Sequence, residues 1–231
     1  MLDENVVSEF VDLARARASF YRMLGGLYLN ELSEDDIARL ARTPLSSVDL
    51  GNDEANEGLA DMEAYLHRAP RNARQELAVD FAGSILAAGV YEERRATPYE
   101  SVFTSASGLL MQEARDDVYR YYCESNIEVD ETLHMPEDHV SFECEFMAVL
   151  AERSADKAAM GDLAGSLADV NLQRSFHAEH LANWIDALCD CLAGCATTRF
   201  YRGVAKLTRG FVLEDGLVLA EMRECLEGMA A

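Results

Sequence analysis

The sequence predicts an all-α protein that forms a single compact bundle of about 9–11 helices. Three observations predict this class. Apolar residues recur with the helical period over most of the chain, and no segment alternates apolar and polar residues between hairpin turns. The composition is that of an ordered helical protein, because 49% of the residues are hydrophobic and only 4 are proline and 14 glycine.

The first predicted helix covers residues 5–31, where one face repeats every three or four residues. That face consists of Phe10, Leu13, Ala14, Arg17, Phe20, Tyr21, Leu24 and Tyr28. Ser33 and Asp36 form a predicted capping box at the start of a short helix that ends near Arg42. Further helices are predicted over residues 53–67, 71–88, 104–125, 136–153, 161–195, 197–212 and 216–229.

Residues 87–103, AAGVYEERRATPYESVF, interrupt the helical pattern. Pro98 cannot continue a helix and favours extended backbone at Thr97, so we expect a connector here. It divides one predicted domain, residues 1–231, into an N-terminal helical part, 1–86, and a C-terminal helical part, 104–231. Connectors of this length are often functional.

The charge balance is strongly acidic, with 42 acidic against 20 basic side chains and a formal net charge of −22. Nucleic-acid and anionic-membrane binding both depend on basic side chains, so this composition argues against both. Two interpretations stay open at this point: the charge keeps the protein in solution, or it attracts a basic partner.

The first residues, MLDENVVSEF, lack the basic start and apolar stretch of a secretory signal, and no apolar run is long enough to span a membrane. We therefore expect a cytoplasmic protein with no stable membrane insertion. Six cysteines would then be reduced, because structural disulfides are rare in that compartment.

Candidate metal and cofactor motifs are weak. The spacing of Cys189, Cys191 and Cys195 does not match a zinc site, and these side chains fit small buried residues better. His177 and His180 lack the metalloprotease pattern, and only one Glu-x-x-His pair, Glu131 and His134, is present where a di-iron bundle needs two. Phosphate-binding loops and nucleophile elbows are absent from the sequence. We predict no metal, no cofactor and no catalytic residues.

A basic stripe on the helix predicted over residues 197–212 consists of Arg199, Arg202, Lys206 and Arg209. It lies opposite the apolar face of that helix. The stripe either pairs with the protein's own acidic surface or binds an anion.

The segment MPEDHVSFECEFMAVL, residues 135–150, combines an apolar helix with ionisable side chains. Pro136 fits the first turn, and Asp138 and His139 would lie at the solvent-accessible N-terminal end, where the helix dipole favours negative charge. Glu143 lies deeper and is expected to be a buried structural acid. Glu145 is expected to face solvent or an arginine such as Arg120.

Four motifs in this order resemble the TorD/DmsD family of chaperones for molybdenum-containing oxidoreductases. They are Pro98-Tyr99-Glu100-Ser101-Val102, then Pro136-Glu137-Asp138-His139 with Glu143, Phe146 and Met147, then Phe176 with His180 and Trp184, and Phe200-Tyr201. Together they extend across most of residues 10–212.

The resemblance implies an all-α chaperone of TorD/DmsD type, not an enzyme. It would bind the twin-arginine signal peptide of an apo-molybdoenzyme catalytic subunit of the DMSO/TMAO reductase type and hold that subunit in the cytoplasm for cofactor insertion before export. The Tat translocase is a further partner that the resemblance allows. The family binding surface corresponds here to Phe81, Ile85, Pro98, Tyr99, Glu100, Ser101, Asp138 and His139.

A receptor for such a peptide needs carboxylates for the two guanidinium groups and an apolar groove for the stretch that follows. Glu100, Glu137 and Asp138 are the predicted carboxylates. The predicted groove consists of Tyr99, Phe103, Phe81 and Ile85. Glu143, His180 and Trp184 are predicted structural supports, and His139 either contacts the peptide or braces the helix.

Two other functions remain open from the sequence. A NarJ-like protein would assemble a nitrate-reductase-type catalytic subunit that is not exported, and a helical metalloenzyme would bind iron or zinc. The resemblance also allows either a monomer or a homodimer that exchanges helices, and guanine-nucleotide binding is undecided.

Overall fold

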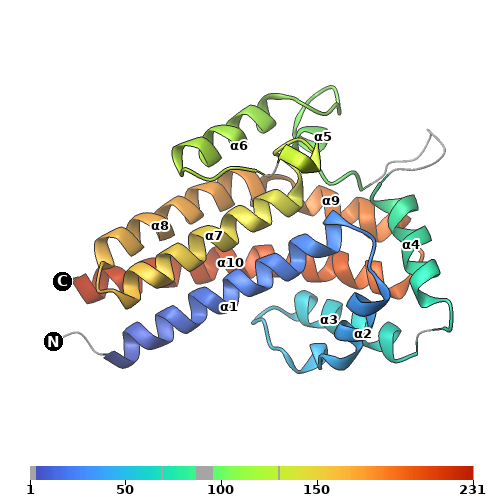
Figure 1. Cartoon of the computed structure of the whole chain (residues 1–231), viewed down its shortest axis with the longest axis horizontal. Helices are drawn as coiled ribbons and strands as arrows, with labels where there is room; N and C mark the ends of the chain where they lie inside the picture. The colour runs from blue at the N-terminus through green and yellow to red at the C-terminus, as the bar shows by residue number, and fades with distance from the viewer. Residues whose placement is uncertain (1–3, 69, 87–95, 130, 231) are drawn as a thin grey trace.

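The long helices α1 (Glu4–Leu29), α7 (Val140–Ala159) and α10 (Arg199–Ala230) run along the length of a helical bundle, and shorter helices pack around them (Figure 1). The computed structural model describes residues 4–68, 70–86, 96–129 and 131–230. Within those residues the helices are α1 (Glu4–Leu29), α2 (Glu34–Arg42), η1 (Leu45–Ser47), α3 (Asp53–His67), α4 (Ala73–Ser84), α5 (Glu100–Thr104), α6 (Glu113–Glu124), η2 (Glu131–Leu133), α7 (Val140–Ala159), α8 (Leu163–Phe176), η3 (His177–Leu181), α9 (Ala182–Cys195) and α10 (Arg199–Ala230). The predicted all-α fold class is confirmed.

Helix α1 packs along α7, while α10 packs against α3, α8 and α9 (Figure 1). Helix α6 lies over α7 and α8 at the edge of the bundle and is joined to it by α5 (Figure 1). The buried apolar side chains of these helices form one cluster. No helix in the described ranges is both long enough and apolar enough to cross a membrane.

Local sequence signals explain several helix starts. The predicted capping box begins α2, because the Ser33 hydroxyl accepts from the backbone N–H of Asp36 and the Asp36 carboxylate accepts from the backbone N–H of Ser33, both at 3.1 Å. Asn52 begins α3 in the same way and accepts from the N–H groups of Glu54 and Ala55. The prediction for α1 was wrong at Leu13, which is 43% exposed.

One long helix replaces the two predicted over residues 197–212 and 216–229. Helix α10 runs unbroken from Arg199 to Ala230, although Asp215 and Gly216 are poor helix formers. The buried side chain of Asp215 binds α1, and a Cβ on Gly216 would lie 2.9 Å from the His177 ring. Asp215 and Gly216 lower the local helix propensity, but their contacts with α1 and with His177 stabilise the unbroken helix in the folded protein.

The helix predicted over residues 161–195 is continuous but contains one π-helical turn. Residues His177–Leu181 form η3 between α8 and α9. A π turn adds a residue to the helix and shifts the side chains that follow it, and such turns are frequent at functional sites. Here the turn contains His180, whose side chain is buried.

Three predicted boundaries around the connector were wrong. Helix α4 ends at Ser84, and the helix predicted over 104–125 begins only at Glu113, as α6, while the end of the predicted connector forms the short helix α5. Helix α7 begins at Val140, so Pro136 precedes it. The first part of the predicted connector, residues 87–95, lies outside the described residues.

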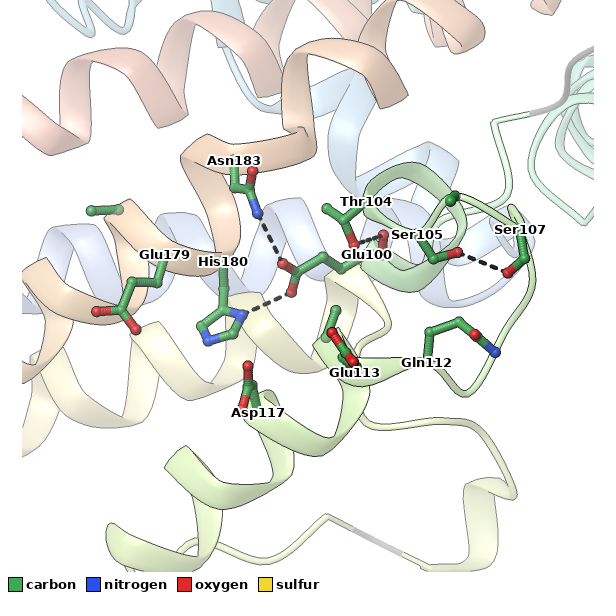
Figure 2. A pocket seen from close by; sticks show the side chains of 13 residues that line it. Glu100, Thr104, Ser105, Ser107, Gln112, Glu113, Asp117, Glu179, His180 and Asn183 are labelled. Carbon is green, nitrogen blue, oxygen red and sulfur yellow. Dashed lines mark hydrogen bonds and ion pairs between the residues drawn. The ribbon is translucent and has the colours of Figure 1, made fainter.

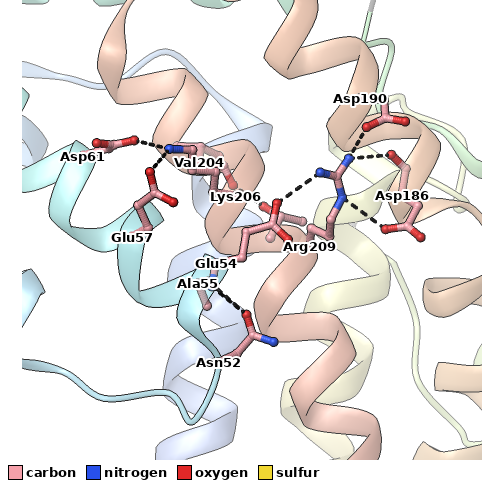
Figure 3. Close-up of polar contacts among 11 residues, drawn as sticks. Asn52, Glu54, Ala55, Glu57, Asp61, Asp186, Asp190, Val204, Lys206 and Arg209 are labelled. Carbon is pink, nitrogen blue, oxygen red and sulfur yellow. Dashed lines mark hydrogen bonds and ion pairs between the residues drawn. The ribbon is translucent and has the colours of Figure 1, made fainter.

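Most of the basic stripe pairs with the protein's own acids (Figure 3). Lys206 binds Glu57 and Asp61 of α3, and Arg199 also binds Asp61. Arg209 contacts three further acidic side chains, Glu54, Asp186 and Asp190. The stripe thus ties α10 to α3 and α9, which is the first of its two predicted roles.

A buried ion pair joins three helices in the core. Arg17 of α1 donates to both carboxylate oxygens of Asp215 on α10, at 2.6 and 2.9 Å, and to Gln173 of α8 at 3.0 Å. The Tyr21 hydroxyl donates to Asp215 at 2.6 Å. Burial disfavours the charge of Asp215, but Arg17 and Tyr21 hold the pKa of this carboxyl below its ordinary value.

We predict that Arg17→Met lowers the free energy of unfolding by about 3–5 kcal/mol, because it leaves Asp215 charged and buried without its partner. Chemical denaturation followed by circular dichroism measures this. Adding Asp215→Leu to Arg17→Met should restore much of the loss. Arg15→Met is the matched control on the same helix, since Arg15 forms only an exposed pair with Asp156, and it should cost less than about 1 kcal/mol. Equal losses for the two arginines would contradict the assignment.

Candidate functional site

The two motif segments that the sequence singled out are hydrogen-bonded to each other. The backbone N–H of Glu100 donates to the carbonyl of Asp138 at 3.0 Å, and that of Val140 donates to the carbonyl of Pro98 at 2.9 Å. These bonds form an antiparallel bridge between Tyr99 and His139. The end of the connector and the start of α7 therefore form one unit.

Asp138 is fully buried, so the predicted accessibility of its carboxylate is wrong. The carboxylate accepts from the backbone N–H of Ser101 at 2.8 Å, at the beginning of α5. It therefore stabilises the start of a different helix from the one that follows it in sequence. Ser101 is also buried, and its hydroxyl accepts from the N–H of Gln112 at 3.2 Å.

His139 is the N-cap of α7 and is only 3% exposed. Its Nδ1 accepts from the backbone N–H of Ser141 at 3.1 Å, and its ring meets that of Tyr99 edge-on at 4.8 Å. Burial lowers the pKa of His139 to about 3, so the imidazole is neutral near pH 7. His139 was predicted either to contact the peptide or to brace the helix, and this geometry supports the bracing role.

The predicted supports gather around Glu100. The Glu100 carboxylate contacts His180 Nδ1 at 2.8 Å and accepts from Asn183 at 3.4 Å. Beneath it, Trp184 Nε1 donates to Glu143 at 3.3 Å. Glu100, Glu143 and His180 are all buried, which makes this a cluster of ionisable groups inside the protein.

Burial raises the pKa of both glutamates in this cluster. For Glu143 the negative charges of Glu100 and Asp138 raise the pKa further, because they disfavour a third charge nearby. Glu143 is therefore the protonated member of the cluster. The charge of Glu100 is opposed by burial but favoured by its contact with His180.

Other predicted site residues serve packing or internal pairing. Glu137 accepts two bonds from Arg115 of α6, at 2.5 and 2.7 Å. Glu145 is exposed and pairs with Arg22 of α1, not with Arg120. Across the described residues, no three His, Cys, Asp or Glu side chains gather in a way that could hold a metal ion.

The apolar residues of the predicted groove are mostly core residues. Phe81 and Ile85 are 1% and 0% exposed, and Pro98 is buried. Phe103 is partly buried and stacks on Trp184 with 5.5 Å between ring centroids, and Tyr99 is partly buried. Phe81 and Ile85 thus do not line an open surface.

An open cleft of about 830 Å³ lies above the buried cluster, between α5 and α6 on one side and η3 and α9 on the other (Figure 2). Glu100 and His180 line it, as do three acids that reach solvent more freely, Glu113, Asp117 and Glu179. Glu179 accepts from the hydroxyl of Tyr121 at 2.8 Å. None of the described lining residues is a lysine or arginine. The cleft therefore suits a cationic ligand.

We name Glu113, Asp117 and Glu179 the rim acids. Sequence reasoning missed them. Glu113 and Asp117 are four residues apart and so share one face of α6. That spacing was the available signal, but only the fold brings this face opposite Glu179 of η3 (Figure 2).

We predict that Glu143→Gln removes a pH-dependent loss of stability. Above the ordinary glutamate value near 4.5, the unfolded chain releases this proton while the folded chain keeps it. The contribution of Glu143 to stability therefore falls as the pH rises from about 4.5 towards the raised pKa of the folded state. The glutamine variant lacks this proton, so its unfolding free energy relative to wild type should increase with pH.

Denaturant titrations at several pH values between about 4 and 8 measure the difference. Glu145→Gln, two positions along on the exposed side of α7, is the matched control and should follow the wild type. A glutamine variant that differs from wild type by the same amount at every pH would show that Glu143 is not a protonated acid.

Comparisons with known proteins agree with this architecture. The family model described as nitrate reductase delta subunit matches residues 50–190. The chaperone protein TorD of Vibrio cholerae serotype O1 is 28% identical over 223 residues, which cover 94% of this chain and 98% of that protein. TorD of Vibrio atlanticus is 27% identical, with 88% and 94% covered. TorD of Shewanella oneidensis is 25% identical, with 91% and 94% covered.

These relatives are named as chaperones, and the similarity to them extends over nearly the whole chain. The resemblance to TorD-type chaperones that the motifs indicated is thereby confirmed. Since the family model covers more than half of the sequence, the protein belongs to the nitrate reductase delta subunit family, which includes the TorD-type chaperones.

Proposed function

We propose that this protein is a chaperone that binds the twin-arginine signal peptide of an apo-molybdoenzyme of the DMSO/TMAO reductase type. It holds this catalytic subunit in the cytoplasm until the molybdopterin cofactor has been inserted, before export through the Tat translocase. The chaperone names of the relatives support the general role. The acidic cleft is the single observation that carries the peptide-binding part.

Arginine recognition favours accessible carboxylates. A guanidinium forms two parallel hydrogen bonds with a carboxylate, and these bonds are strongest where both groups are charged. The rim acids line a cleft large enough for extended side chains, and its lining contains no lysine or arginine. Asp117 pairs with Arg120 of the same helix at 3.1 Å, so a ligand would have to share or displace this exposed contact. The net charge of −22 would in addition accelerate the approach of a basic peptide.

The structure changes how the predicted peptide-binding residues contribute to this proposal. Asp138 and His139 have internal partners and are buried, so they act by fixing the connector against α7. Glu100 lies at the bottom of the cleft, where a long cationic side chain could approach it. The rim acids, together with Glu100, are the proposed guanidinium contacts.

We predict that Glu113→Gln, Asp117→Asn and Glu179→Gln together weaken binding of a synthetic twin-arginine peptide by about tenfold or more, since each removes a charge-assisted contact. Calorimetry measures the affinity. Raising the salt concentration should weaken wild-type binding and affect the variant less. The control is Glu9→Gln, Asp12→Asn and Glu221→Gln, which removes the same charge from exposed positions on α1 and α10. Equal peptide affinity for the rim-acid variant and the control variant would show that the arginines do not bind in the cleft.

A second candidate is a NarJ-like chaperone that assembles a nitrate-reductase-type catalytic subunit without export. The description of the matching family model favours it. The two functions differ in what the cleft must recognise. An export chaperone requires paired arginines, whereas an assembly chaperone of a retained subunit has no such requirement.

We therefore predict that replacing both arginines of the peptide by lysines reduces affinity for the wild-type protein, because lysine cannot form the two-pronged contact. The same titration with the rim-acid triple variant should show a smaller difference between the two peptides. Indifference to the exchange in the wild type would favour the second candidate. An independent test is to identify by mass spectrometry the subunits that copurify from the native cell. A twin-arginine sequence at the N-terminus of the copurifying subunit supports the export chaperone, and its absence supports the NarJ-like chaperone.

A further inference from the structure

Three consecutive large apolar side chains are exposed at the loop between α5 and α6. Leu109, Leu110 and Met111 are 62%, 41% and 58% exposed. We name them the apolar tip. Elsewhere in the described chain, no two exposed large apolar side chains are adjacent in sequence. Exposed apolar side chains that gather in this way commonly mark a contact surface.

The loop that carries the apolar tip is held by its own hydrogen bonds. The N–H of Gly108 donates to the hydroxyl of Ser105 at 3.1 Å, and the side chain of Gln112 donates to the carbonyl of Leu110 at 2.8 Å. Met111 has a φ of 59°, in the left-handed region that residues other than glycine rarely adopt. The apolar side chains are thus held outward by a defined backbone.

The apolar tip is continuous with the acidic cleft. Ser105, Ala106 and Ser107 line the cleft on one side of the tip in sequence, and Gln112 and Glu113 line it on the other. A chain that places its cationic side chains among the rim acids can therefore continue over the tip without leaving the protein surface. Apolar residues next to the cationic ones would cover the tip.

Three partners could cover this surface: a second copy of the chain, a lipid surface or a peptide. The charge of the protein distinguishes among them. A second copy of the chain would bring another −22 towards the same acidic rim, and an anionic lipid surface would be repelled as well. A peptide that is basic and then apolar complements both parts. Buried apolar area adds affinity in the same complex, while the cleft supplies orientation.

We propose that the apolar tip binds the apolar stretch that follows the arginines of the client's signal peptide. This proposal rests on the proposed function, because it takes the cleft as the site of the arginines. It adds that the loop between α5 and α6 reads the apolar part of the same ligand, in place of the buried Phe81 and Ile85.

The test compares two proteins and two peptides. The tip variant carries Leu109→Ser, Leu110→Ser and Met111→Asn, where asparagine tolerates the left-handed backbone. One peptide has two arginines followed by a leucine-rich stretch, and in the other serines replace the leucines. The tip variant should bind the leucine peptide about tenfold more weakly than wild type does, while both proteins bind the serine peptide equally.

Leu213→Ser with Leu217→Ser is the matched control, since these side chains on α10 are 65% and 59% exposed and lie outside the cleft lining. It should bind both peptides as the wild type does. Circular dichroism checks that each variant keeps its helical content. The variants change exposed positions, so folding should be preserved.

Two results would overturn the proposal. The first is that the tip variant binds the leucine peptide as tightly as the wild type does. If that variant also loses self-association in ultracentrifugation, or binding to lipid vesicles, the tip contacts a second copy of the chain or a lipid surface and not the peptide. The second is an equal loss for both peptides, which would mean that the tip only supports the cleft. Neither result touches the proposed function, which fails separately if the rim-acid triple variant binds arginine peptides normally.

Discussion

The carboxylate of Asp138 holds the site together, because its bond to the backbone N–H of Ser101 begins α5 at the end of the connector. That helix is only one turn long and could not be stable alone. Once it is fixed, Glu100 meets His180 on the π turn, and residues 105–112 are directed outward between α5 and α6. This buried bond, together with the backbone bridge between Tyr99 and His139, positions both the cleft and the apolar tip.

The acids of this region fall into two groups with different physics. Glu100, Asp138 and Glu143 are buried beside one another, and the burial of three charges together would be very costly. The cost is reduced because Glu143 keeps its proton, Glu100 contacts His180 and Asp138 accepts from a helix start. The rim acids remain in contact with solvent, where Asp117 also pairs with Arg120 and Glu179 accepts from Tyr121. In the proposed complex, a cationic ligand would therefore reach the rim acids before the buried acids.

Local patterns predicted local structure well and long-range contacts poorly. The capping box at Ser33 and the continuous helix up to Cys195 depend on neighbouring residues and were predicted. The prediction for Asp138 was wrong because a carboxylate just before α7 is expected to contact the dipole of α7. In the fold, this carboxylate instead accepts from the backbone N–H of Ser101 in α5. The break predicted near Gly216 failed for the same reason, since Arg17 lies 198 positions away in sequence from Asp215. Motif resemblance singled out two segments that the fold joins through the bridge between Tyr99 and His139, but it could not tell which of their side chains face solvent.

The rim acids show why composition hides a site. In a chain with 42 acidic residues, two acids one helical turn apart carry little information, and only the fold shows that Glu113 and Asp117 face the same cleft as Glu179. In the proposed complex, the surface charge and the cleft would nevertheless act together. Long-range attraction is weak in salt and cannot orient a peptide, whereas carboxylates in a cleft orient a guanidinium only after it has arrived. An apolar surface at the edge of the cleft adds what neither provides, because its contribution persists at high salt and depends on the residues that follow the arginines. Among peptides that carry paired arginines, selection would then be made at Leu109, Leu110 and Met111, while the rim acids would distinguish arginine from other basic residues.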